Sequence, residues 1–435
     1  MIDPGLISVI LIGGLVLLLA IGAPVSISIA LPSAICMMLI VGFENGAGTS
    51  AQQMIRGANS FALLAIPFFV LAGVIMNNGG IAERLINLAR VCVGRMSAPL
   101  VQTNVIANAI FGSVSGSAVA AAAAVGSTMA PMQRKEGYDP AFSAAANVAS
   151  APTGMLIPPS NTLIIYSLAA GGTSVGALFL AGYIPGILWA LGCSVVVYFY
   201  ARNHPELKGQ PWPSVAVFAK TFLRALPSLG LVVVVIGGIV VGYFTPTEGA
   251  AVAVIYALLL SFLYRAVGWR DLPRILYEAC RTSSIVIFLI AVSTIMGYVM
   301  AYARIPQLIA DTLFGWTDNK VVVLLIMMLV LLVIGIPLDP TPAILIFVPI
   351  FLPIAVSYGI DPVHFGIMMV FNLSIAVISP PSAPVLFVGT QVAGTRLEPV
   401  IAKLAPFLVV LIGLLFLVVF VPELSLWLPR VFGLL

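Results

Sequence analysis

GYDPAFSAAANVASAPTGMLIPPS, residues 137–160, reappears in altered form 222 positions later as GIDPVHFGIMMVFNLSIAVISPPS, residues 359–382. The two stretches align without a gap, and their Gly, Asp-Pro and Pro-Pro-Ser positions coincide. Apolar segments often match by chance, but a shared register across double prolines is much less common. The sequence therefore predicts an internal duplication, with a first repeat over 1–200, a cytoplasmic linker over 201–225 and a second repeat over 226–435.

The composition is that of a membrane protein from end to end. Hydrophobic residues make up 61% of the 435 residues, charged residues 8%, and the mean hydropathy is +1.16. Apolar runs of about 17–25 residues, the length of a membrane helix, recur along the chain, and the alternating pattern of a β-barrel strand is missing. We therefore expect an all-α polytopic membrane protein. The net charge of +4 comes from basic loops, so no nucleic-acid partner is expected.

Two pairs of apolar runs are too long for a single crossing. They lie at 98–135 and 138–170 in the first repeat, and at 320–357 and 360–395 in the second. The first run of each pair predicts a re-entrant hairpin of two half-membrane helices. The second predicts a membrane helix broken at its double proline. Such irregular backbone is tolerated in a membrane only where protein or a water-filled cavity surrounds it.

The distribution of basic residues predicts how the repeats are oriented. Each predicted repeat makes five crossings, so the second repeat enters the membrane upside down relative to the first. With both termini outside, 15 of the 19 Lys and Arg residues lie inside, and the exceptions are Arg56, Arg304, Lys320 and Arg430. This asymmetry follows the positive-inside rule, and inverted repeats are typical of secondary transporters.

The double prolines predict ion and substrate sites at mid-membrane. Because proline has no N–H, the breaks deprive four carbonyls of their helical donor: those of Gly154, Met155, Ala376 and Val377. An unpaired carbonyl in lipid costs several kcal/mol, and a hard cation such as sodium prefers oxygen ligands. After the first break, Ser160, Asn161 and Thr162 stand at a helix N-terminus, which favours an anion.

The hairpin tips supply further polar groups. The first tip, GSVSGS at 112–117, has three hydroxyls and glycines that permit a sharp turn. The second, GIPLDPTPA at 335–343, contains Asp339, and an acid inside a membrane is expensive and usually functional. Asp339 could bind a cation, hold a substrate hydroxyl or amide, or carry a proton. Plainer explanations remain open for the other groups: close helix packing for GSVSGS, and a capped kink for PPSNT.

Several other polar residues have structural interpretations. Asp139 and Asp361 each precede a proline, as at an ordinary helix start. Thr245 and Glu248 fit a capped helix start in the same way, and His364 has no partner histidine. No metalloprotease, serine hydrolase or nucleotide-binding motif is present in the sequence, so we expect no enzyme activity and no catalytic residue.

Four stretches, taken in order, resemble the large membrane subunit of tripartite ATP-independent periplasmic (TRAP) transporters. They are SFALLAIPFFVLAGVIMNNGGIAERL (60–85), SVSGSAVA (113–120), YFTPTEGAAVAVIYALLL (243–260) and LDPTPAILI (338–346). The resemblance covers nearly the whole chain. One departure is the second break, where the family usually has Thr-Pro-Pro, an aliphatic residue and Gly, and this chain has SPPSAP (379–384).

The resemblance implies a sodium-coupled importer of a small organic acid anion that works by an elevator mechanism in the bacterial inner membrane. It implies two partners, a small four-helix membrane subunit and a periplasmic substrate-binding protein, and no cofactor beyond coupling sodium ions. A standalone sodium- or proton-coupled anion symporter of the same wider superfamily is the alternative. A channel is a further rival, but no repeated selectivity loop is present.

Three sets of site residues follow from carrying the family's roles onto the matching positions. The first sodium site is expected at Ser113, Ser115, Gly116, Gly154 and Pro158. The second sodium site is expected at Gly335, Pro337, Asp339, Thr341, Ala376 and Ser382. The substrate is expected between the tips, at Ser115, Ser117, Ser160, Asn161 and Asp339.

Overall fold

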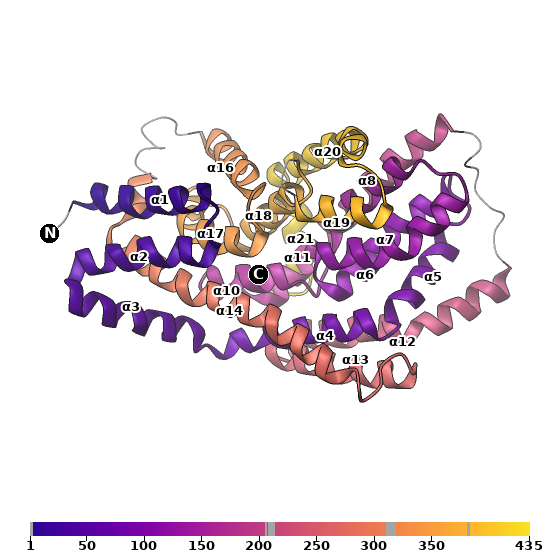
Figure 1. The fold of residues 1–435 in the computed structure, drawn as a ribbon, viewed down its shortest axis with the longest axis horizontal. Helices are drawn as coiled ribbons and strands as arrows, with labels where there is room; N and C mark the ends of the chain where they lie inside the picture. Colours follow the sequence, from indigo (N-terminus) through magenta and orange to yellow (C-terminus); the bar gives the residue numbers. More distant parts are fainter. Residues whose placement is uncertain (1–2, 205–206, 208–213, 310–318, 381–382) are drawn as a thin grey trace.

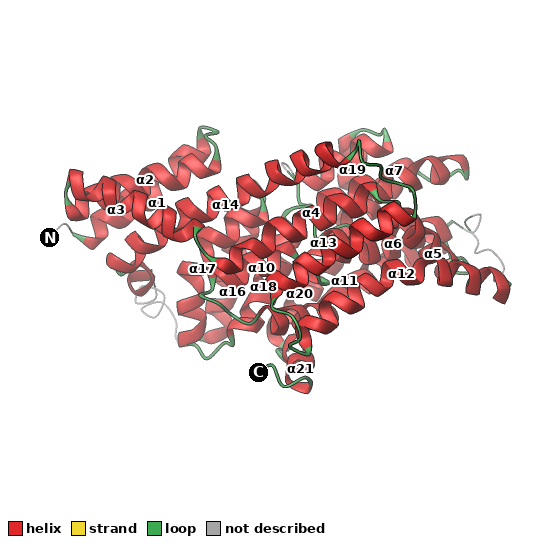
Figure 2. Cartoon of the chain, turned by 90° about the horizontal axis from the view of Figure 1, so that it is seen from below, coloured by secondary structure: helices red, strands yellow, loops and turns green. Residues whose placement is uncertain are grey.

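A computed structural model describes residues 3–204, 207, 214–309, 319–380 and 383–435. The described chain folds into helices joined by loops, without strands (Figure 2). Seven helical segments within it are long and apolar enough to cross a membrane. The all-α polytopic architecture predicted from the sequence is therefore confirmed.

The first half of the chain contains the helices that precede the first break and the two that follow it. These are α1 (Pro4–Ala20), α2 (Val25–Val41), α3 (Phe43–Ala58), η1 (Phe61–Leu64), α4 (Ala65–Asn78), α5 (Ile81–Val93), α6 (Pro99–Ser115), α7 (Ala118–Lys135), α8 (Pro140–Ser150), α9 (Thr153–Leu156), α10 (Asn161–Ala169) and α11 (Val175–Arg202).

The second half has a comparable series. It comprises α12 (Val215–Val240), α13 (Pro246–Leu263), α14 (Leu272–Tyr302), α16 (Lys320–Gly335), α17 (Pro340–Ser357), α18 (Pro362–Ala376), α19 (Pro384–Ala393), α20 (Leu397–Phe420) and α21 (Glu423–Val431).

The helix boundaries follow the same offset as the sequence. Helices α7, α8 and α11 begin 222 residues before α17, α18 and α20 respectively. The helices are interrupted around the double prolines. Helix α9 ends at Leu156 and α10 begins at Asn161, while α18 ends at Ala376 and α19 begins at Pro384. The repeat boundaries, the linker limits and the inverted orientation of the repeats remain predictions.

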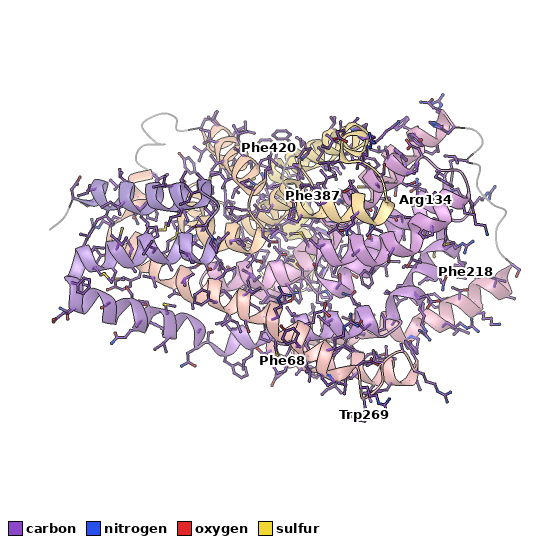
Figure 3. All side chains as sticks on the ribbon, in the orientation of Figure 1. Phe68, Arg134, Phe218, Trp269, Phe387 and Phe420 are labelled. Carbon is purple, nitrogen blue, oxygen red and sulfur yellow. The ribbon has the colours of Figure 1, made fainter. Side chains whose placement is uncertain are left out.

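Two packed groups of helices are visible in the fold. In one, α14 packs on α2, α3 and α4, while α13 packs on α4 and α12 (Figure 1). In the other, α6 and α7 pack on each other and on α8, and α16 and α17 pack on each other and on α18. The halves interlock in this second group, because α19 packs against α7 and α10 packs against α17. The Arg134 guanidinium at the end of α7 donates to the carbonyl of Ala393 at the end of α19 (Figure 3).

The arms of the two hairpins are longer than half-membrane helices. Helices α6 and α7 have 17 and 18 residues, and α16 and α17 have 16 and 18. An 18-residue helix is about 27 Å long, close to the ~30 Å thickness of the hydrocarbon core. The arms are therefore longer than the predicted half-membrane helices, and the re-entrant course of the hairpins stays a prediction. Pro131 lies inside α7, and Pro349 and Pro353 lie inside α17, yet both helices continue past these prolines.

The outer surface of the molecule carries many large apolar side chains. Val233 and Val409 are each 71% exposed, Leu263 75% and Tyr243 81%. Figure 3 labels others on separate parts of the chain, among them Phe218, Trp269 and Phe420. A soluble domain would leave such side chains in water, whereas a bilayer covers them.

Candidate functional site

A cavity of about 590 Å³ lies where the hairpin tips, the two breaks and the first group of helices meet. The second group of helices contributes residues of α7, α9, α10 and α17 and the loops beside them. The opposite wall comes from the start of α2, from α4 and from α14. The cavity therefore lies along the boundary between the two packed groups.

The first hairpin tip reaches the cavity through Gly116 and Ser117. Gly116 has a left-handed backbone, with φ of 63°, and a Cβ there would lie 3.3 Å from the amide nitrogen of Asn161 and from the carbonyl oxygen of Pro159. Both the turn and the close approach require glycine. Ser117 caps α7, and its Oγ accepts a hydrogen bond from the Ala120 N–H at 3.3 Å.

The other two serines of this tip do not line the cavity. The Ser113 hydroxyl donates to the Ile110 carbonyl at 2.7 Å, one turn back on α6. The Ser115 hydroxyl, at the end of α6, lies 3.4 Å from the Ser117 carbonyl oxygen, to which it donates. Both side chains are buried.

The first break places its polar residues in two different environments. Asn161, the first residue of α10, lines the cavity together with Thr162 and Met155. Ser160 is fully buried; its Oγ accepts from the Leu163 N–H at 3.3 Å and donates to the Met155 carbonyl at 2.5 Å. Ser160 thus caps α10 and satisfies one of the carbonyls that the prolines leave without a helical donor.

Each hairpin packs directly against one break. A Cβ on Gly154 would lie 2.2 Å from the carbonyl carbon of Gly112, so the two glycine backbones are in contact. A Cβ on Gly335 would lie 2.8 Å from the Cβ of Ala376. Among the described residues, no N–H or O–H donates to the Gly154 carbonyl. The first hairpin thus meets its break through backbone atoms, and the second meets the Ala376 side chain. Pro158 is buried away from the cavity.

The second hairpin tip presents a carboxylate to the cavity. Asp339 caps α17, with its Oδ1 accepting from the Thr341 N–H at 3.2 Å, and both residues line the cavity. The other oxygen, Oδ2, accepts no hydrogen bond from the described chain. Gly335 and Pro337, by contrast, do not line this cavity.

The second break differs from the first in how its carbonyls are satisfied. The Ala376 carbonyl accepts from the Ser379 N–H at 3.0 Å, and the Ser379 hydroxyl donates to the Ile375 carbonyl at 2.8 Å. Val377 lines the cavity. Ser382, predicted for the second sodium site, lies outside the described residues.

The lining residues from the two halves correspond in position. Ser117 and Asp339 are 222 residues apart, and so are Met155 and Val377. The chemistry of the two positions differs, since the hydroxyl of Ser117 in the first half corresponds to the carboxylate of Asp339 in the second. Of the residues predicted for the sodium and substrate sites, five line the cavity: Gly116, Ser117, Asn161, Asp339 and Thr341.

Sequence reasoning missed the opposite wall of the cavity. It includes Ser26 at the start of α2, Val70 on α4, and Thr282 and Phe288 on α14. Met155 and Val377 could have been predicted to line the cavity, because the 222-residue offset aligns them and each directly follows a predicted carbonyl ligand. Nothing in the pattern of the apolar spans marked the wall residues.

Asp339 is the one ionisable side chain among the residues that line the cavity. The other polar lining groups are neutral hydroxyls and the Asn161 amide. None of the described residues that line it is a lysine, arginine or histidine, so positive charge next to a bound anion would come from helix N-termini that begin at the cavity, such as those of α7 and α10, or from a bound cation.

The residues interpreted as structural have the predicted roles. Asp139 caps α8 and Asp361 caps α18, each accepting a backbone N–H two residues on. Thr245 and Glu248 form a capping box at the start of α13. His364 is buried, with its Nδ1 2.6 Å from the Ser425 hydroxyl.

Comparison with known proteins places the chain in a family. Residues 12–424 match the family described as "Tripartite ATP-independent periplasmic transporter, DctM component". The chain is 49% identical to the uncharacterized protein YgiK of Salmonella typhimurium, with 98% of each chain covered. It is 37% identical to the sialic acid TRAP transporter large permease protein SiaM of Vibrio cholerae, and the match covers 95% of this chain and 96% of SiaM. It is 39% identical to the C4-dicarboxylate TRAP transporter large permease protein DctM of Pseudomonas aeruginosa, and that match covers 88% of this chain and 90% of DctM.

Two solved structures share the fold at low sequence identity. The YdaH transporter of Alcanivorax borkumensis aligns with a TM-score of 0.56 at 15% identity, covering 86% of this chain and 88% of that one. MtrF of Neisseria gonorrhoeae aligns with a TM-score of 0.57 at 14% identity, covering 97% and 95%. With its helical membrane fold and the family match over nearly its full length, the chain belongs to the large permease subunits of TRAP transporters.

Proposed function

We propose that the chain imports a small organic acid anion together with sodium, and that the cavity at the hairpin tips is the binding site. The observation that carries this proposal is the charge of the cavity. Asp339 is the one ionisable side chain among the described residues that line the space, and none of these residues is cationic. An anion placed beside an ionised carboxylate is repelled, so anion binding requires a cation to enter as well.

The chain offers oxygen ligands for such a cation. The Gly154 carbonyl receives no hydrogen bond from the described residues, and it lies at the contact with the first tip. In the second half, Asp339 Oδ2 is the corresponding free acceptor. Sodium, a hard cation, takes carbonyl and carboxylate oxygens. One acceptor lies in the break of the first half and the other at the hairpin tip of the second half, which supports the two predicted sodium sites.

The substrate anion has its own set of donors. Asn161 stands at the N-terminus of α10 and its amide can donate, while the hydroxyls of Ser117, Thr162 and Thr341 line the same cavity. Helix N-termini favour anions by both their unpaired N–H groups and their dipole. The relatives' names mention sialic acid and C4-dicarboxylate, both organic acids.

An elevator mechanism fits the place of the cavity at the boundary of the two helix groups. In such a mechanism the hairpins and broken helices would move as one body against α2, α4 and α14, carrying the bound anion. We further propose a location in the bacterial inner membrane with both termini periplasmic. The partners would be a small membrane subunit and a periplasmic binding protein that delivers the substrate.

Transport in proteoliposomes tests the proposal. The chain is reconstituted with the small subunit, and uptake of radiolabelled N-acetylneuraminate and succinate is measured with and without the cognate binding protein. We expect uptake of an organic acid to require an inward sodium gradient and to stop when choline replaces sodium. Uptake at the same rate in choline would contradict sodium coupling. Uptake without any binding protein would instead favour the standalone symporter.

A further inference from the structure

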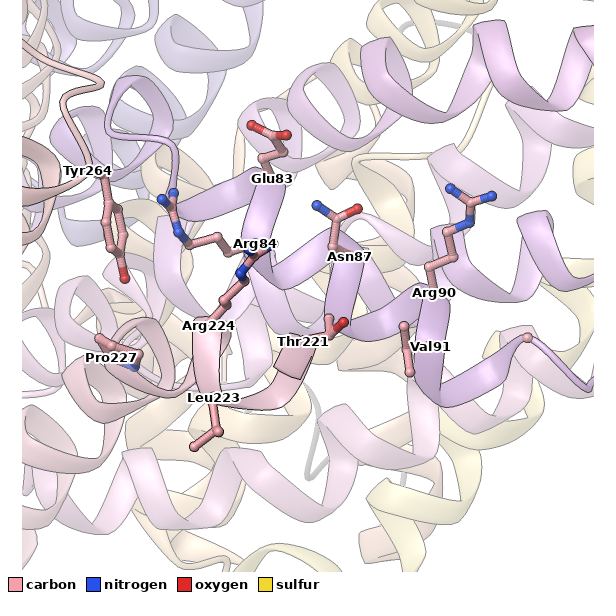
Figure 4. A pocket seen from close by; sticks show the side chains of 11 residues that line it. Glu83, Arg84, Asn87, Arg90, Val91, Thr221, Leu223, Arg224, Pro227 and Tyr264 are labelled. Carbon is pink, nitrogen blue, oxygen red and sulfur yellow. The ribbon is translucent and has the colours of Figure 1, made fainter. Parts of the chain in front are cut away.

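A second cavity, of about 840 Å³, lies between α5, α12 and the end of α13 (Figure 4). It shares no lining residue with the cavity at the hairpin tips. Three arginines line it, Arg84 and Arg90 on α5 and Arg224 on α12, against one acid, Glu83. We call this space the arginine cavity. The proposed transport function gives these residues no role.

The three guanidiniums have no carboxylate partner in the described chain. In the described chain the ion pairs are Lys403 with Asp139 and Arg430 with Glu423, so no described carboxylate lies within 4.0 Å of these three guanidiniums. Like charges that face one volume repel each other. The arrangement is therefore favourable only when an anion, or water and counterions, occupy the cavity.

Arg84 is held in place from two sides. Its Nη1 donates to the Gly80 carbonyl at 2.8 Å, and its Cζ lies 3.4 Å from the ring centroid of Tyr264, which also lines the cavity. In Figure 4 the side chains of Arg84 and Arg224 extend toward the same space from facing helices. A guanidinium fixed in this way keeps further N–H groups for a second acceptor, and its planar fork matches phosphate oxygens.

The surroundings of Arg224 favour a position of the cavity at the level of lipid headgroups. No charged residue follows Arg224 on α12 as far as its end at Val240. Next to Arg224, Phe222 is 40% exposed, Leu223 64% and Leu226 46%. Basic residues at the start of an apolar span lie among lipid phosphates, with the apolar side chains beyond them in the hydrocarbon.

We propose that the arginine cavity binds the phosphate-bearing headgroup of an anionic phospholipid, whose acyl chains lie along the exposed apolar face of α12. Free inorganic phosphate has the same charge chemistry, but it leaves Leu223 and Leu226 uncovered. A lipid satisfies the guanidiniums and covers these side chains at once.

Thermal unfolding of the full chain, stripped of lipid in detergent, tests this assignment. Dioleoyl phosphatidylglycerol, dioleoyl phosphatidylcholine and inorganic phosphate are added separately at equal ionic strength. We expect phosphatidylglycerol to raise Tm well beyond the shifts given by the other two. The double variant Arg84→Gln/Arg224→Gln should lower the apparent affinity for phosphatidylglycerol about 25-fold, since each arginine contributes a factor of about five. Arg274→Gln, an exposed arginine on α14 outside the cavity, should leave the shift unchanged.

Three results would overturn the proposal: equal shifts with phosphatidylglycerol and phosphatidylcholine, a phosphate shift as large as that of the lipid, or wild-type lipid affinity in the double variant. If the double variant does not fold, Arg90→Gln replaces it. The Arg90 side chain makes no hydrogen bond or ion pair with the rest of the described chain, and its removal should weaken phosphatidylglycerol binding about fivefold. Unchanged binding in that variant would also contradict the assignment.

Discussion

Asp339 combines two roles at one position. One carboxylate oxygen caps α17 through the Thr341 N–H, and the other faces the cavity without a hydrogen bond from the described chain. Asp139 and Asp361 cap their helices in the same way, but neither lines the cavity. Comparing the three aspartates thus separates helix capping, which all three share, from the charge at the cavity that the proposed sodium binding requires.

Replacing Asp339 by Asn therefore gives a sharp test. Asparagine caps helices as well as aspartate does, so folding should be preserved while the negative charge is lost. A charge-assisted contact contributes about 1.5–3 kcal/mol, so the apparent sodium affinity should fall by about 10- to 100-fold. Sodium-dependent uptake and thermal shift measure it. Asp361→Asn is the control and should keep near-normal affinity; equal effects of the two variants would assign Asp339 a capping role alone.

Ser160 is the second residue with an argued double role. Ser160→Ala removes the cap of α10 and leaves the buried Met155 carbonyl without its donor. We expect the unfolding free energy to fall by about 2–4 kcal/mol. Loss of the helix cap contributes about 1 kcal/mol, and the unsatisfied buried carbonyl contributes about 1–3 kcal/mol. Ser174→Ala on α11 loses only a cap of the same kind and should cost about 1 kcal/mol. Thermal or denaturant unfolding compares them, and matching losses would show that the Met155 carbonyl finds another donor.

At the scale of elements, the contact between each hairpin and its break is the feature on which the proposed sodium sites depend. In the first half this contact is glycine against glycine, Gly112 on Gly154, so nothing larger than hydrogen fits. In the second half Gly335 meets Ala376 instead. The first contact is between two backbones and the second is with the Ala376 side chain, so the proposed sodium sites differ at this level.

Gly154→Ala should push the first hairpin away from its break. The added Cβ would lie 2.2 Å from a backbone atom of Gly112, which cannot move aside alone. Overpacking of this type costs about 1–3 kcal/mol, and the sodium-dependent part of the stability should disappear with it. Gly237→Ala on α12 meets nothing within 4 Å and should be neutral or slightly stabilising. Thermal unfolding with and without sodium measures both, and an unchanged sodium shift in Gly154→Ala would separate that glycine from the ion site.

How far the sequence predicts these elements depends on the type of signal. Prolines and caps act locally, so the double prolines predicted both breaks, and Asp-Pro pairs predicted the starts of α8 and α18. The short helices α3 and α5 were missed because neither is apolar enough or long enough to stand out beside the spans. The Ser160 to Met155 bond was also missed, since it depends on the path of the chain between α9 and α10.

At the scale of the whole molecule, the cavity is built from two helix groups, and sequence reasoning identified only one of its walls. The tips and breaks were predictable because the duplication marks them twice. The wall on α2, α4 and α14 is set by how the two groups pack, and Phe288 or Val70 looks no different in the sequence from residues that face lipid. Packing between distant apolar spans leaves little trace in composition.

The predicted inverted orientation of the repeats determines which side of the membrane each loop should face. In a variant whose four cysteines are replaced, Arg56→Cys and Lys320→Cys should react with an impermeant maleimide applied outside the cell. Arg270→Cys and Arg274→Cys should react only after the membrane is opened, since all four positions are exposed and differ in the predicted side. Labelling of all four from the same side would rule out the inverted arrangement.

The most direct test of the central claim measures thermal unfolding of the purified chain in sodium chloride and in choline chloride at equal ionic strength. A ligand that binds only the folded state stabilises it by about 1.4 kcal/mol at ten times its dissociation constant. We expect Tm to rise with sodium, not with choline, and the rise to be lost in Asp339→Asn and kept in Asp361→Asn. Identical unfolding in the two salts across the whole concentration range would contradict sodium binding at the breaks and tips.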